Sequence, residues 1–134
     1  MAVLSSLAKY KDTGLLIMRA GLGVMFMYHG YPKLFGGPEF WGKIGQAMGT
    51  VGISFLPVVW GLLAAIAEAV GGLFILIGFL FRPASFFLLF TMAIATCMHL
   101  KSEGLMQASH ALELAFVFAG LLFTGPGKYS VDKK

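Results

Sequence analysis

The sequence predicts an all-α integral membrane protein, a four-helix bundle whose helices run alternately up and down. Hydrophobic residues make up 58% of its 134 positions and charged residues only 12%, whereas an average soluble domain has about 45–50% and about 25%. The apolar residues gather in four stretches, each close to the roughly 20 residues with which a helix crosses a bilayer. Short breaks separate the last three stretches, and short connections make neighbouring helices antiparallel.

The four expected helices lie within one domain, residues 1–134. The first stretch is not a cleavable signal peptide, because Arg19 interrupts its apolar run and no cleavage site of small residues follows. Proline is tolerated in the first turn of a helix but not in its interior, so Arg82-Pro83 ends the second helix and begins the third. Gly125 and Pro126 are typical of the residues that follow a helix, and they end the fourth. The expected spans are about residues 13–31, 56–81, 83–100 and 108–124.

An interfacial segment is expected between the first two spans, over about residues 38–52. Its larger apolar side chains recur at helical spacing with polar residues between them, at Phe40, Trp41, Ile44, Met48 and Val51. An amphipathic helix of this kind lies in the membrane interface or covers one end of a bundle. Glycines at positions 42, 45 and 49 weaken a helix, so an irregular or re-entrant loop is the alternative.

The charges predict how the chain lies in its membrane. The net charge is +4 and the pI is near 9.4, an excess that in a membrane protein sets topology and meets anionic lipid. No basic stripe with aromatics indicates nucleic-acid binding. Basic residues 9, 11, 82, 128, 133 and 134 fall on the side of both termini, and 33, 43 and 101 on the other side. We therefore expect a bacterial-type inner (plasma) membrane location with both termini cytoplasmic.

Three ionisable side chains inside the predicted spans are candidate catalytic or proton-carrying residues. They are Arg19 in the first span, Glu68 midway along the second and Glu113 early in the fourth. Such a charge costs about 2.5–3.5 kcal/mol at the centre of a spanning helix, and it usually faces the bundle interior. We predict an Arg19–Glu68 pair, direct or through water, and the alternative is that Arg19 reaches back to the interface. Protonation would neutralise the charge of the glutamate that is left over.

The three histidines are expected at the end of the bundle away from the termini. His29 ends the first span, His99 ends the third and His110 begins the fourth, with Lys33 at a similar level. Three interpretations stay open: a metal or haem site, a polar pocket for a quinone head group, or histidines that meet water and lipid head groups. No HxxxH or HExxH spacing is present, so no metal ligands are assigned. The candidate pocket contains these four residues together with Glu113.

Other catalytic signatures are absent from the sequence. Cys97 is the single cysteine, so neither an intramolecular disulfide nor a CxxC pair can form. There is no Walker loop, no dinucleotide fingerprint after a strand and no serine in a nucleophile elbow. No covalently bound cofactor is expected, and a redox role would need a quinone or a redox partner subunit.

Three segments together resemble the DoxX family of small four-helix membrane proteins. They are RAGLGVMFMYHGYPKLFGG at residues 19–37, EAVGGLFILIGFLFRPAS at 68–85 and TGPGKYSVD at 124–132, so the resemblance covers nearly the whole chain. It places the family's polar positions at Arg19, His29, Lys33, Glu68, Arg82 and Glu113. It implies a link, in some relatives, to thiosulfate–quinone oxidoreduction or to redox-stress complexes. Many relatives have no settled activity, and a fold does not fix a function.

Functions of different classes remain open at this point. The first is a quinone- or redox-linked membrane subunit of an oxidoreductase, in which a quinone carbonyl accepts a hydrogen bond while a carboxyl or histidine relays the proton. The second is a non-enzymatic membrane scaffold or assembly factor. Besides the lipid bilayer and a redox partner subunit, further copies of the chain in a homo-oligomer are expected as partners. The third is a small-molecule or proton-coupled transporter, although the paired broken helices typical of transporters are not seen in the sequence.

Overall fold

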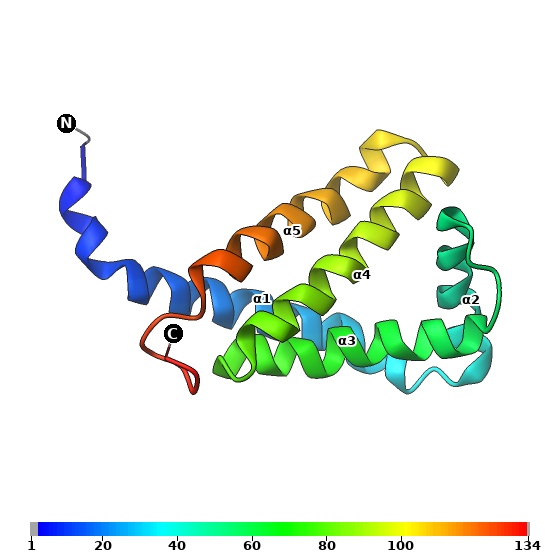
Figure 1. Ribbon diagram of the computed structural model, residues 1–134, viewed down its shortest axis with the longest axis horizontal. Coiled ribbons are helices and arrows are strands. Elements are labelled where there is room, and N and C mark those ends of the chain that lie inside the picture. The colour runs from blue at the N-terminus through cyan, green and yellow to red at the C-terminus, as the bar shows by residue number, and fades with distance from the viewer. Residues whose placement is uncertain (1–2, 134) are drawn as a thin grey trace.

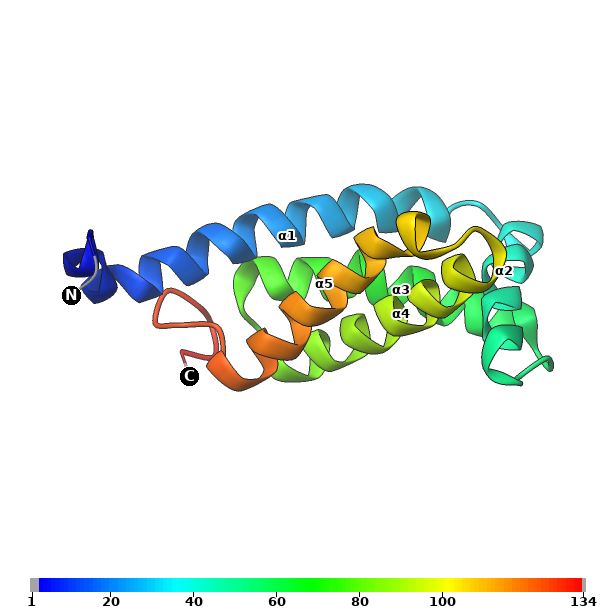
Figure 2. The ribbon, with the colours of Figure 1, turned by 90° about the horizontal axis from the view of Figure 1, so that it is seen from above.

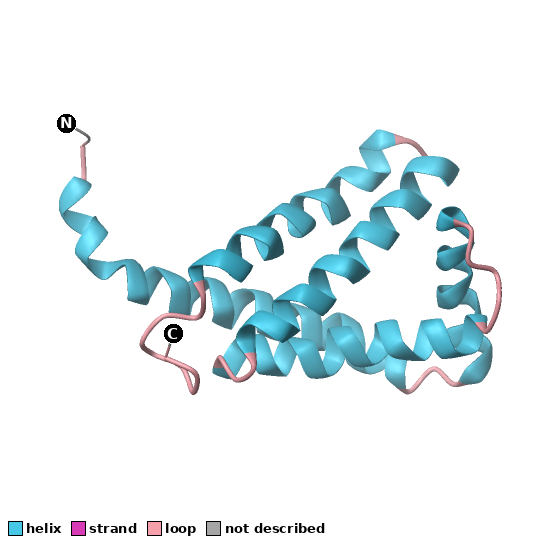
Figure 3. Ribbon diagram, viewed as in Figure 1, coloured by secondary structure: helices cyan, strands magenta, loops and turns pink. Residues whose placement is uncertain are grey.

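The computed structural model describes residues 3–133, which contain helices and no strand, and this confirms the all-α prediction (Figure 3). Two short elements are 3₁₀ helices and the others are α-helices. In chain order the elements are η1 (Ser5–Tyr10), α1 (Lys11–Leu34), α2 (Pro38–Gly45), η2 (Gln46–Val51), α3 (Pro57–Ile77), α4 (Phe81–Ser102) and α5 (Leu105–Thr124).

The long helices form two antiparallel pairs that diverge from one end. α1 packs against α3 and α4 packs against α5, while α3 and α4 are joined at a tight turn and spread apart from it (Figure 1). α2 and η2 lie across the open end, where they contact α3 and α4. Both termini lie at the opposite end, that of the α3–α4 turn (Figure 2). The helices do not close into the predicted four-helix bundle, because α1 and α5 are not packed backbone against backbone.

Glycines determine how closely α1 and α3 approach. A Cβ atom at Gly23 would lie 2.6 Å from the carbonyl oxygen of Gly72, and one at Gly72 would lie 2.9 Å from that of Gly23. A Cβ at Gly30 would overlap the backbone of Ala69. Small residues at helix interfaces let backbones approach closely in membranes. We call this line of close contact between α1 and α3, at Gly23, Gly30 and Gly72, the α1–α3 seam. It brings the polar side chains of α1 within reach of α3.

The apolar core joins the two pairs. Phe26 of α1 and Phe118 of α5 meet edge to face, with ring centroids 5.2 Å apart. Around this contact lie buried residues from α3, α4 and α5, namely Ile75, Phe81, Ala84, Leu88, Met92, Ala111, Ala115 and Leu121. Aromatic pairs in this geometry stabilise by about 0.5–1.5 kcal/mol beyond the area they bury. This side-chain contact links α1 to α5, although the backbones of these two helices are further apart than those of α1 and α3 or of α4 and α5.

Within residues 3–133, three helices are long and apolar enough to cross a membrane: α3, α4 and α5. α1 is longer than each of these, but Arg19 and His29 make its composition more polar. Most of the expected boundaries also move by one to four residues, and two of these shifts have a clear local cause. α3 ends at Ile77, four residues early, because Gly78 takes a left-handed φ of 73°, and α4 already begins at Phe81, so that Pro83 lies in its first turn.

The segment predicted to be interfacial is helical, as α2 and η2. The alternative, an irregular loop, rested on glycines 42, 45 and 49, and the structure gives one of them, Gly45, a packing role against α3, where Gly61 has a matching one. A Cβ at Gly45 would overlap the carbonyl of Pro57, and one at Gly61 would overlap that of Trp41. Glycine is therefore required because the backbones of α2 and α3 touch, and not because the chain is irregular there.

Candidate functional site

Arg19 is buried at the end of the molecule that carries the termini. Its side chain is 1% exposed, and the guanidinium donates hydrogen bonds to four backbone carbonyls. Two acceptors are Ile75 (3.1 Å) and Leu76 (2.8 Å), in the last turn of α3. The other two are Pro126 (3.2 Å) and Tyr129 (2.9 Å). Carbonyls at a helix C-terminus lack intrahelical partners and form the negative end of the helix dipole, so they can accept from a cation.

The predicted Arg19–Glu68 pair is therefore wrong. Glu68 lies seven residues before Ile75 on α3, about 10 Å along the helix axis at roughly 1.5 Å per residue. The guanidinium finds acceptors at the near end of α3 instead. They are main-chain oxygens, which no side-chain pattern in a sequence reveals.

The C-terminal segment, residues 125–133, connects Arg19 to the α3–α4 turn. The carboxylate of Asp132 accepts hydrogen bonds from the backbone nitrogens of Leu80 (3.1 Å) and Phe81 (2.7 Å). It thus caps the N-terminus of α4, whose first amides have no partner within the helix. The backbone nitrogen of Val131 donates to the carbonyl of Ile77 at 3.1 Å. The TGPGKYSVD motif therefore has a structural role in this fold.

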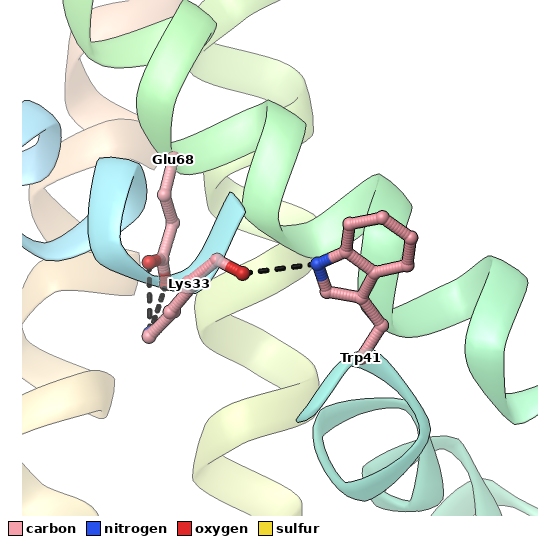
Figure 4. Close-up of polar contacts among 3 residues, drawn as sticks. All are labelled: Lys33, Trp41 and Glu68. Atoms are coloured by element: carbon pink, nitrogen blue, oxygen red, sulfur yellow. Dashed lines mark hydrogen bonds and ion pairs between the residues drawn. The ribbon is translucent and has the colours of Figure 1, made fainter. Parts of the chain in front are cut away.

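The second charged group inside the fold is an ion pair between α1 and α3. Lys33 Nζ lies 2.8 Å from Glu68 Oε2 and 3.1 Å from Oε1, and the side chains are 34% and 6% exposed. Trp41 Nε1 donates to the backbone carbonyl of Lys33 at 2.9 Å and so ties α2 to the end of α1 (Figure 4). Glu68 faces the interior as predicted, with a lysine and not Arg19 as its partner.

A cavity of about 880 Å³ lies between the diverging helices α3 and α4, beneath α2 and η2. Its volume is within the range of about 300–1,000 Å³ typical of small-molecule sites. Aliphatic and aromatic side chains form most of its wall. The polar or charged side chains among its lining residues are Lys33, Lys43, Trp60, Glu68, Thr91 and His99. Trp60 Nε1 is buried and has no hydrogen-bond partner among residues 3–133.

The predicted pocket is only partly assembled. Lys33 and His99 line the cavity, and His99 Nδ1 lies 2.9 Å from Glu103 Oε1. His29 lies instead in a separate depression formed by α1 and α2, and His110 and Glu113 lie on the outer surface of α5. Lys33 also lines the depression that holds His29. The structure therefore places Lys33 beside His29 in one depression and beside His99 in the other, and it places His110 and Glu113 in neither, because they lie on a face of α5 that turns away from both.

Sequence reasoning missed Trp60 and Lys43 as site residues. Tryptophan is enriched at membrane interfaces, so a tryptophan near the end of a span does not by itself indicate a ligand site. The lack of a hydrogen-bond partner for Trp60 Nε1 is a property of the packed structure, which the pattern of apolar residues does not report. Within residues 3–133, no three His, Cys, Asp or Glu side chains gather as a metal site would require.

The chemistry of the cavity suits a molecule with a polar head and an apolar body. An ammonium, an indole N–H and an imidazole can donate hydrogen bonds, and the Glu68 carboxylate can accept one. Polar groups placed sparsely among apolar walls orient a ligand, while the walls bury most of its surface.

Comparison with known proteins supports the resemblance found in the sequence. The family model described as DoxX matches residues 14–100. The chain is 34% identical to the inner membrane protein YqjF of Escherichia coli, over 93% of this chain and 94% of that protein. It is 28% identical to the inner membrane protein YphA of the same organism, over 90% and 89%, and 29% identical to an uncharacterized protein of Haemophilus influenzae, over 98% and 97%. No solved structure matches.

Proposed function

The chain belongs to the DoxX family of inner membrane proteins, and from this premise we propose that it is a quinone- or redox-linked membrane subunit. The proposed quinone site is the cavity between α3 and α4. Its size and its mostly apolar wall, with Lys33, Trp60 and His99 as donors, support a ligand that joins a carbonyl head to a long apolar tail. The subunit would act with a redox partner, since Cys97 offers no thiol pair of its own.

The observation that carries the proposal is the unpartnered indole of Trp60. A buried N–H group that makes no hydrogen bond costs free energy, about 1–3 kcal/mol in proteins. Trp60 lines a cavity that is otherwise mostly apolar. Protein atoms cover this N–H in the structure, so the proposal requires the indole to turn toward the cavity that it lines. A ligand carbonyl would then supply the missing acceptor, while its apolar tail would cover the aromatic side chains of α4, Phe86, Phe87 and Phe90.

The residues of this chain would bind the head group and move protons. Conversion of a quinone to a quinol adds a proton to each carbonyl oxygen, and the electrons would come from the partner subunit. His99 can transfer a proton, because it lines the cavity and its ring also contacts Glu103 at the exposed α4–α5 turn. Lys33 would hold Glu68 in place as an acceptor for a quinol hydroxyl. The proposal thus retains Glu68 among the candidate catalytic residues and gives Arg19 and Glu113 no role in the cavity.

The proposed topology adds α1 as a fourth span, with both termini cytoplasmic. Support comes from the antiparallel packing of α1 against α3 and from both termini lying at one end of the molecule. The larger group of basic residues lies at that same end, as the positive-inside rule requires of a cytoplasmic side. Fluorescent-protein and alkaline-phosphatase fusions to the C-terminus would distinguish the two orientations.

The test is binding of a quinol analogue to the purified protein in detergent. Trp41→Phe leaves Trp60 as the remaining tryptophan, so its fluorescence reports on the cavity. We expect quenching and a higher melting temperature with the analogue. Trp60→Phe should raise the dissociation constant roughly tenfold, the effect of losing about 1.4 kcal/mol.

A matched pair of charge-neutralising variants provides the control. Glu68→Gln alters the cavity, whereas Glu113→Gln alters a carboxyl in another span that lies outside it. The first should weaken binding and the second should not. No quenching, no thermal shift and no quinone in the lipids extracted with the protein would refute the proposed function.

A membrane scaffold is the second candidate, because Arg19 and Asp132 hold backbone segments together. Cavity variants that still fold would then keep every partner that the wild-type protein captures. The structure gives less support to a transporter, since α1, α3, α4 and α5 each run without a break.

A further inference from the structure

Glu113 faces outward from the monomer, although it lies within a helix that is long and apolar enough to span a membrane. It is eight residues beyond Leu105, about 12 Å from the start of α5 at roughly 1.5 Å per residue. Its side chain is exposed, and no residue among 3–133 makes a hydrogen bond or ion pair with it. Ionisable side chains within spans almost always face a protein interior or a water-filled cavity. The monomer does not supply that interior for Glu113.

The same face of α5 carries a complementary base. His110 lies one turn before Glu113, is exposed, and also lacks a partner among the described residues. Met106, Gly120 and Thr124 continue the face at helical spacing, and all three are exposed. We call the surface made of these five residues the α5 face.

Gly120 has no packing role in the monomer. A Cβ atom at this position would meet nothing within 4 Å, in contrast to Gly23 and Gly72 on the α1–α3 seam. Glycine weakens the interior of a helix, yet it lets a second helix approach closely in a membrane. Its place on the α5 face, seven residues after Glu113, points to a neighbour from outside the monomer.

We propose that the α5 face is a homodimer interface, in which two copies pack α5 against α5 about a twofold axis along the membrane normal. A twofold interface brings the same patch of both copies together. In two copies inserted in the same direction, each residue lies at the same depth as its counterpart in the other copy. Glu113 of one copy is then only about 4.5 Å along the membrane normal from His110 of the other, at 1.5 Å per residue. The Glu113 side chain of each copy then contacts His110 of the other.

Charge complementarity favours a second copy over a foreign partner. Each Glu113–His110 contact is neutral overall, whether the shared proton lies on the carboxyl or on the imidazole. A different partner would have to present its own base at this depth, whereas this chain already carries one. Gly120 lets the two helix axes approach closely enough for these side chains to meet.

Two glycines make a matched test of the interface. Gly120→Leu fills the α5 face, and Gly21→Leu fills an exposed position on α1 where a Cβ also meets nothing within 4 Å. Neither substitution should disturb the monomer, which circular dichroism and thermal melting would check. In vesicles, energy transfer between labelled copies should show that Gly120→Leu raises the dimer dissociation constant at least tenfold and that Gly21→Leu leaves it within about twofold. Equal effects, or a monomeric wild-type protein, would overturn the proposal.

The polar contact is tested separately. Glu113→Leu and His110→Ala should each raise the dimer dissociation constant roughly tenfold, because each removes an interhelical hydrogen bond inside the membrane. Glu39→Leu is the control, because this carboxyl is exposed on α2, away from the α5 face. Wild-type affinity in the Glu113→Leu and His110→Ala variants would remove these residues from the interface.

Cross-linking in native membranes distinguishes the occupants. Cys97 is the single cysteine, so Cys97→Ser gives a background without thiols. Gly120→Cys in this background should form a disulfide-linked homodimer on mild oxidation, whereas Gly21→Cys should not. A product of Gly120→Cys with the mass of a different protein would show that the α5 face serves a foreign partner and would refute the dimer.

Discussion

Replacing Arg19 by methionine should lower the free energy of unfolding by about 3–6 kcal/mol, the net value of its two buried hydrogen bonds at about 1.5–3 kcal/mol each. The guanidinium donates four hydrogen bonds of 2.8–3.2 Å. The bonds to Ile75 and Pro126 are buried and account for this loss. The bonds to Leu76 and Tyr129 are only partly buried, so water can replace the donor there and these two bonds add little. Methionine fills much of the space but offers no donor.

The assay is reversible unfolding in mixed micelles by titration with an anionic detergent, followed by far-UV circular dichroism. Arg19→Lys should fall between the wild type and Arg19→Met, because an ammonium is a point charge that cannot span both pairs of carbonyls. Arg82→Met is the control: its guanidinium is exposed and donates to the carbonyl of Leu122 at 2.9 Å. Because water competes for the contacts of an exposed charge, a loss of about 1 kcal/mol or less is expected. If Arg19→Met cost no more than Arg82→Met, the four carbonyl contacts would not stabilise the fold.

Three further predictions use the same unfolding assay. Asp132→Ala removes the cap of α4 and should cost about 1–2 kcal/mol, so an unchanged midpoint would contradict this role. Lys33→Met and Glu68→Gln, made singly and together, should show a coupling of about 1–2 kcal/mol, and additive losses would mean that the ion pair contributes nothing. Gly72→Ala should cost about 1–3 kcal/mol, because its Cβ would lie 2.9 Å from backbone atoms of α1. Gly21→Ala adds a Cβ in open space and should raise the free energy of unfolding by about 0.5–1 kcal/mol. If Gly72→Ala and Gly21→Ala shifted the unfolding midpoint in the same direction, close backbone packing at the α1–α3 seam would be refuted.

Helix positions could be predicted from the sequence because apolar runs and Gly/Pro breaks act locally. The interior locations of Arg19 and Glu68 were also predictable, since a charge in hydrocarbon is too costly to leave against lipid. Their partners were not. Arg19 binds main-chain oxygens that every residue possesses, and Lys33 reaches Glu68 because the glycine seam sets how closely α1 approaches α3.

The candidate pocket failed for a related reason. His110 and Glu113 are three residues apart and therefore share one face of α5, but their spacing does not tell which face of the helix turns inward. That choice depends on which helices pair. Here α4 and α5 pair apart from α1 and α3, so the shared space opens between α3 and α4, and the apolar residues that line it look like ordinary core.

The contacts of Arg19 with Pro126 and Tyr129 bear on the order in which the protein is made. Translation delivers the arginine early and these acceptors more than one hundred residues later. The nascent chain must therefore hold a guanidinium whose coordination is incomplete until Pro126 and Tyr129 have been translated. Quality-control proteases could recognise the chain while Arg19 lacks these acceptors, and a chain truncated before Pro126 would stay in that state.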